Sequence, residues 1–111
     1  MLARKYKLKK DNDFKKIFEK GRQCQSNFIR LKYLKNELIF SRLAVIIGAK
    51  TIKKAAERNQ IKRRVEEIIR LNWQKIKPGF DIILIIQPGI KGKTYSEIEA
   101  ELATLFKKAK L

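Results

Sequence analysis

The sequence contains no histidine and only one cysteine, Cys24. Histidine is the side chain that most often acts as a general acid or base near neutral pH, so its absence removes the commonest route to a hydrolytic active site built from protein. A single cysteine excludes an internal disulfide, and no histidine is present to share a metal ion with it. We therefore expect Cys24 to be a small buried hydrophobic residue or an inert thiol.

Negative charge is also scarce, since 11 Asp and Glu residues stand against 28 Lys and Arg residues. The carboxylates fall at a helix start or on polar helix faces, where capping and intrahelical pairing account for them. We expect no catalytic residue and no metal site in the protein. The formal net charge of +17 is far more than solubility requires, and such an excess repels itself unless a polyanion binds.

Long apolar runs are missing as well. The longest, residues 43–49, is far too short to span a bilayer, and residues 1–10 lack the apolar core of a signal peptide. The basic residues are spread through the chain rather than gathered on one amphipathic helix with an unburied apolar face, which favours nucleic acid over a lipid surface. We expect a cytoplasmic RNA-binding protein, with residues 1–111 forming a single domain around one core.

Hydrophobic periodicity predicts the order α-β-β-β-α-β-α, hence one four-stranded sheet with helices packed on it. The first helix is expected to take Asp11 or Asn12 as its N-cap and to end at Gly21. The other predicted elements are strands at 22–25, 28–34, 42–48 and 80–86, a long helix at 53–72 and a closing helix at 96–108. The strand at 28–34 alternates and is expected to be half-buried, whereas the strand at 42–48 is expected to be covered on both faces.

The long helix has two chemically different sides. On a helical wheel its isoleucines and Val65 cluster on one side, which predicts docking onto the sheet. Cations and one amide project from the other side or flank the apolar stripe, a pattern suited to binding phosphates, although basic helix faces are often merely solvated. We call this set the basic face; its members are Arg58, Asn59, Lys62, Arg63 and Arg70.

The segment at 55–63, with the sequence AAERNQIKR, resembles the signature helix of the bacterial ribonuclease P protein component. The resemblance extends over nearly the whole chain. A basic stretch is followed by Asp13-Phe14, Ile17-Phe18 and Gly21, as in the opening pattern of that family. Residues 41–45 and 77–83 are similar to the family's strands before and after the helix.

Three positions depart from the family pattern. Gln60 and Glu66 replace basic residues of the signature helix, and Ala49 stands where a second basic residue is usual beside Lys50. The helical wheel places Glu66 on the edge of the basic face. We therefore expect it to be exposed and to pair with neighbouring cations.

The resemblance implies a two-layer α/β sandwich of the ribosomal protein S5 domain 2-like class, with a left-handed crossover between the strands at 42–48 and 80–86. It also implies the protein subunit of an endoribonuclease. In ribonuclease P an RNA subunit carries catalysis with bound Mg²⁺, and the protein helps to recognise precursor tRNA and remove its 5′ leader. Neither an organic cofactor, a membrane nor a further protein partner is expected.

By the same resemblance, the basic face contacts the catalytic RNA, and a cleft beside the first helix holds the single-stranded leader. Phe14 and Phe18 become the aromatic floor of that cleft, although aromatic residues at this spacing are often simply core. A structural RNA-binding protein, such as a ribosomal protein or an RNA chaperone, is the alternative function. The predicted leader site comprises Phe14, Phe18, Lys50, Lys53 or Lys54, and Lys32 or Tyr33.

Overall fold

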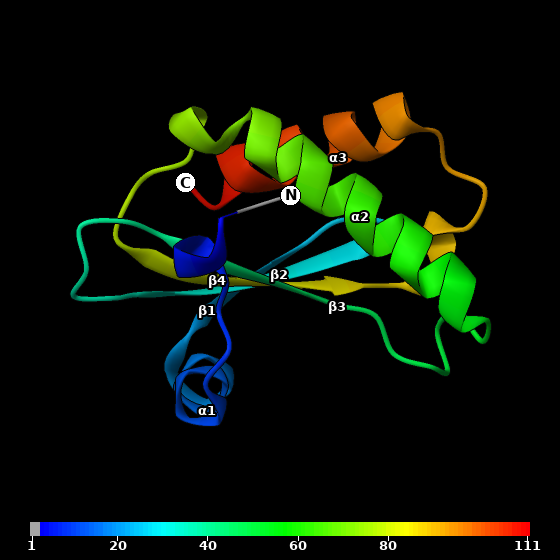
Figure 1. Cartoon of the computed structure of the whole chain (residues 1–111). Helices are drawn as coiled ribbons and strands as arrows, with labels where there is room; N and C mark the ends of the chain where they lie inside the picture. The colour runs from blue at the N-terminus through cyan, green and yellow to red at the C-terminus, as the bar shows by residue number, and fades with distance from the viewer. Residues whose placement is uncertain (1–2) are drawn as a thin grey trace.

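The computed structural model describes residues 3–111 (Figure 1). Its element order confirms the predicted succession of helices and strands, with three short 3₁₀ helices in addition. The strands are β1 (Arg22–Gln25), β2 (Ile29–Lys35), β3 (Arg42–Ile46) and β4 (Phe80–Ile86). The helices are α1 (Asp11–Lys20), α2 (Ala55–Leu71) and α3 (Tyr95–Lys108), and the 3₁₀ helices are η1 (Arg4–Tyr6), η2 (Trp73–Lys75) and η3 (Pro88–Ile90). None of the helices within these residues is long and apolar enough to cross a membrane.

The four strands form one mixed sheet in the order β1-β2-β4-β3. β2 pairs antiparallel with both β1 and β4, whereas β3 and β4 are parallel and α2 connects them. The parallel pair confirms that a crossover joins these strands. Its left-handedness stays a prediction.

The helices cover the two faces of the sheet unequally. α2 and α3 lie side by side over one face, and α1 lies on the opposite face (Figure 1). The larger core fills the first layer, while a smaller cluster of Leu8, Ile17 and Ile83 is buried under α1. Because α1 covers only part of its face, Ala44 and Ile46 are half-buried. The expectation of a strand covered on both faces as far as residue 48 is therefore wrong.

Both ends of α1 are set by backbone geometry. The predicted N-cap at Asp11 or Asn12 is wrong, because Lys10 takes that position and makes no side-chain cap bond; Asp11 lies in the first turn, where a carboxylate favours the helix dipole. Gly21 ends the helix as predicted, but in extended backbone rather than a left-handed turn. A Cβ there would lie 2.9 Å from the carbonyl oxygen of Tyr33, so only glycine allows this close approach to β2.

A buried ion pair fixes α1 over the sheet. Asp81, the single charged residue of β4, accepts two hydrogen bonds from Arg42, with Nε–Oδ1 at 2.9 Å and Nη2–Oδ2 at 2.7 Å. The same guanidinium lies 3.4 Å from Asp13 in the first turn of α1. These hydrogen bonds raise the pKa of Arg42. α1 is thereby held at β3 by its first turn and at β2 by its last.

α3 begins and ends with defined caps. Thr94 and Glu97 form a reciprocal capping box at its start. At its end the backbone N–H of Leu111 donates to the Phe106 carbonyl at 2.9 Å, which closes a Schellman-type turn. The turn places Lys110 at φ 61°, the one positive φ of a non-glycine residue within 3–111. This conformation costs about 1–2 kcal/mol for a residue with a Cβ.

Candidate nucleic-acid interface

The basic face of α2 points away from the core as predicted. Ile61, Val65, Ile68 and Ile69 are buried against the sheet and α3. Four members of the basic face are exposed: Asn59, Lys62, Arg63 and Arg70. At 1.5 Å per residue, Asn59 and Arg70 stand about 16 Å apart along the helix axis, enough to follow several phosphates of an RNA strand.

Arg58 differs from the rest of the basic face because it is half-buried. Its Nη1 donates to the carbonyl oxygens of Ile52 at 2.8 Å and Lys53 at 3.0 Å. These bonds fix the segment that enters α2. Arg58 therefore positions the lysines of that segment in addition to any contact of its own with RNA.

Arg70 sits at the far end of the basic face in an exposed pair with Glu67. Its Nε donates to Glu67 Oε2 at 3.2 Å. This hydrogen bond lowers the pKa of Glu67 and raises that of Arg70. Exposed pairs of this kind are weak, so an RNA phosphate can replace the carboxylate as the partner of Arg70.

A shallow depression of about 390 Å³ lies on the exposed side of α2. It brings Gln60 between Asn59 and two arginines, Arg63 and Arg64. Arg64 was not among the predicted site residues; its exposure is the signal that adds it to this surface. The cationic surface thus extends further around the helix than the predicted basic face and partly offsets the missing charge at Gln60.

Glu66 contradicts the prediction of an exposed carboxylate, because only 9% of this residue is accessible. The helical wheel assumes that only the isoleucine stripe of α2 is covered. The N-terminal segment also packs beside this helix, since the Tyr6 ring lies 5.1 Å from that of Trp73. Trp73 lies in η2, just beyond the end of α2 at Leu71. The burial of Glu66 shows that more of α2 is covered than its isoleucine stripe.

The two aromatic residues predicted for the leader site differ in their surroundings. Phe14 is half-buried and packs against the cluster under α1. Phe18, one turn later, is 44% exposed, and the Lys32 ammonium lies 5.1 Å from its ring centroid. Phe18 therefore has ring surface available for a nucleobase, whereas Phe14 belongs mainly to the core.

Lys32 and Tyr33 lie on opposite faces of the sheet. Lys32 pairs with Ile83, which is buried under α1, and Tyr33 pairs with Ile82, which belongs to the core under α2 and α3. Only Lys32 shares a face with Phe18. The structure therefore does not bring Tyr33 together with the rest of the predicted leader site.

The three lysines after β3 are exposed on the connection to α2. A turn shapes this connection: the backbone N–H of Thr51 donates a hydrogen bond to the carbonyl oxygen of Gly48 at 3.0 Å. β3 starts at Arg42, beside α1, and runs about 13 Å away from it to Ile46. Lys50, Lys53 and Lys54 thus lie beyond the far end of β3, across the uncovered part of the sheet from α1.

Arg30 is a further candidate that was not predicted as a site residue. It lies on the same face as Lys32, opposite the half-buried Ile85 of β4. Its Nε is buried and has no hydrogen-bond acceptor among the described residues. The alternation of β2 had placed Arg30 on the polar face, but its position on the uncovered part of the sheet follows only from the tertiary structure.

Within residues 3–111, no three His, Cys, Asp or Glu side chains gather closely enough to hold a metal ion. The carboxylates of this part of the chain therefore do not fit a Mg²⁺ site.

Comparison with known proteins gives concordant matches. The family model described as Ribonuclease P matches residues 2–110. The ribonuclease P protein component of Alkaliphilus metalliredigens is 36% identical over 105 residues, covering 95% of this chain and 94% of that protein. The ribonuclease P protein of Staphylococcus aureus superposes with a TM-score of 0.87 at 30% identity, over 95% of each chain. That of Thermotoga maritima superposes with a TM-score of 0.85 at 31% identity, over 92% of this chain and 96% of the other.

Proposed function

The chain belongs to the ribonuclease P protein family, and from this premise we propose how its two faces divide the work of the enzyme. As the protein subunit of ribonuclease P, it acts in tRNA processing as part of an endoribonuclease complex with an RNA partner. The alternative of a ribosomal protein or RNA chaperone is not favoured.

We propose that the RNA subunit carries catalysis and holds the Mg²⁺ that the reaction requires, in the cytoplasm. When bound, Mg²⁺ supplies an activated water and neutralises charge on the phosphate. The contribution of this chain is to bind and orient RNA. Its basic side chains neutralise phosphates without taking part in bond cleavage.

The observation that supports this proposal is that two surfaces with the chemistry suited to RNA lie on opposite faces of one sheet. α2 presents the basic face over one layer, and α1 presents the exposed ring of Phe18 over the other. Arginines and an amide suit the phosphates and sugars of the RNA subunit. An exposed ring with Lys32 beside it suits an unpaired base and its phosphate, as in the 5′ leader of precursor tRNA.

On the leader face, Phe18 stacks on a base while Lys32 neutralises the adjacent phosphate. Arg30 supplies further donors on the uncovered part of the sheet. Beyond the end of β3, the single-stranded RNA leader meets Lys50, Lys53 and Lys54. Arg58 holds the segment that carries these lysines, so it links the basic face to the leader face.

A cleavage assay on precursor tRNA at limiting Mg²⁺ tests this function. Stimulation only in the presence of the cognate ribonuclease P RNA is the expected result. Cleavage by the protein alone would place an active site in the chain. Failure to stimulate the RNA at any concentration would contradict the proposed division of labour.

A further inference from the structure

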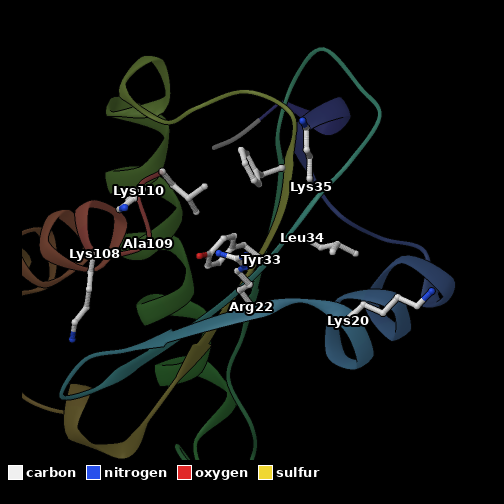
Figure 2. Close-up of a pocket in the computed structure, with 10 residues that line it drawn as sticks. Lys20, Arg22, Tyr33, Leu34, Lys35, Lys108, Ala109 and Lys110 are labelled. Carbon is white, nitrogen blue, oxygen red and sulfur yellow. The ribbon is translucent and has the colours of Figure 1, made fainter.

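A pocket of about 530 Å³ opens where β1 begins, outside the surfaces described above. It contains no member of the basic face and only one residue of the predicted leader site, Tyr33. Figure 2 shows Tyr33 in the middle of the group, with Lys108 and Lys110 on one side and Lys20 on the other. We call it the Tyr33 pocket; around that ring it carries Lys20, Arg22, Lys35, Lys108 and Lys110.

The cations of the Tyr33 pocket come from three separate parts of the chain, residues 20–22, residue 35 and residues 108–110. The ends of α1 and β2, the first residue of β1 and the residues that close α3 each contribute. No Asp or Glu side chain lines the pocket, and within residues 3–111 none of the five cations forms an ion pair. The terminal carboxylate of Leu111, which also lines the pocket, is one negative charge against the five cations. The remaining excess of positive charge repels itself, so this arrangement favours a bound anion.

Lys110 gives independent support because its backbone is strained. It occupies the left-handed position that ends α3, where glycine is the usual residue. Its side chain is exposed, so burial of its stem does not explain the choice of lysine. Residues with strained backbone cluster at active sites, ligand clamps and switch regions. A lysine in this position directs a cation to the rim of the pocket at the expense of fold stability.

The floor of the pocket is aromatic. The rings of Tyr33 and Phe80 are half-buried and meet edge to face, with their centroids 6.2 Å apart. Every nucleobase has a π-face that can stack on such rings, and the surrounding cations match the phosphates on either side of the base. The volume falls within the range of about 300–1,000 Å³ typical of small-ligand sites.

We propose that the Tyr33 pocket binds an unpaired nucleotide of RNA together with its flanking phosphates, as a third RNA contact of the protein. The proposal rests on the proposed function only in taking RNA as the partner. The nucleotide belongs either to the RNA subunit or to the 5′ leader, and both sources share this chemistry. The site also gives Tyr33 a role on the face of the sheet opposite Phe18.

The test uses the full chain with its RNA subunit and compares Arg22→Gln/Lys110→Gln with a control of equal charge, Lys75→Gln/Lys107→Gln. All four residues are exposed, and the control residues lie outside the Tyr33 pocket and both predicted surfaces. Three affinities are measured: protein for the RNA subunit, and holoenzyme for precursor tRNA with a long or a very short leader. Wild-type stimulation of cleavage and the Phe18→Ala variant are measured alongside, so a failure of the proposed function is recognised separately.

The pocket variant is expected to lose at least about fivefold in affinity, with the salt slope reduced by about 1.4 because each single-strand phosphate contact contributes about 0.7. The control variant should lose less than about twofold in each of the three RNA affinities. If the affinity for the RNA subunit falls, the bound nucleotide belongs to that RNA. If only the affinity for precursor tRNA with the long leader falls, the nucleotide belongs to the leader. Equal losses for pocket and control variants in every arm would overturn the proposal.

Lys110→Gly separates binding from structure. Glycine relieves the backbone strain, so the Tm should rise, while the affinity for the same RNA should fall. A raised Tm with unchanged RNA affinity in all arms would show that Lys110 merely ends the helix, and the proposal would lose its strongest residue.

Discussion

Replacing Phe18 by alanine tests the leader face most directly. The ring is 44% exposed, so it can stack on a base without any rearrangement of α1. A base stacked on an aromatic side chain is worth about 1–3 kcal/mol, which corresponds to a loss of roughly fivefold to 150-fold in affinity. Phe18→Ala should therefore weaken holoenzyme binding of precursor tRNA by this factor and leave binding of mature tRNA nearly unchanged.

The fold should tolerate the Phe18→Ala change. The ring contacts the Lys32 ammonium at 5.1 Å, a partly exposed cation–π interaction worth about 0.5–1 kcal/mol. We expect the free energy of unfolding to fall by roughly 1 kcal/mol. Phe14→Ala is the matched comparison, because Phe14 packs against the buried cluster under α1 and its loss should cost about 2 kcal/mol or more.

The measurement is an equilibrium titration of holoenzyme with leader-bearing and mature tRNA, combined with urea unfolding of the protein alone. Phe18→Tyr should restore leader affinity, because it keeps the π-face. Equal loss for both ligands would mean that Phe18 supports the fold or the RNA-subunit contact instead. Unchanged affinity for the precursor would refute the stacking role outright.

Four further predictions concern other parts of the molecule. Arg63→Gln should lower affinity for the RNA subunit and reduce the log–log salt slope by about one unit; an unchanged slope would show that Arg63 meets no phosphate. Glu66→Arg should lower the Tm, because a larger cation must enter a position only 9% accessible; an unchanged Tm would mean that Glu66 is exposed after all. Asp81→Ala should reduce the free energy of unfolding in urea by about 3 kcal/mol, since it leaves the half-buried Arg42 without its bidentate partner; a loss below about 1 kcal/mol would refute this anchor. The backbone N–H of Thr94 holds the pKa of Glu97 below its usual 4.5, so the contribution of this cap is present above that pH and is lost as the pH falls through the lowered value. The protection of amides in the first turn of α3 against hydrogen exchange, taken relative to their intrinsic rate at each pH, should fall there, and Glu97→Gln should remove this pH dependence.

Local sequence patterns sufficed for the element order and for the two sides of α2. Alternation along β2 and the apolar run of β4 are properties of neighbouring residues, and β4 spans the predicted residues 80–86. The isoleucine stripe of α2 likewise follows from a period of 3.6 residues. Charge composition alone indicated a polyanionic partner, because net charge does not depend on how the chain folds.

The fine structure of the interface depends on contacts between distant residues. Arg58 turns to two carbonyl oxygens because the segment before α2 folds back against it, and Glu66 is buried although its own helix leaves it open. Strand register sends Tyr33 to the face opposite Phe18 and into a pocket with the end of α3. Periodicity and charge are encoded within a few residues of sequence, whereas burial, face and pocket lining are fixed only when segments many residues apart pack together.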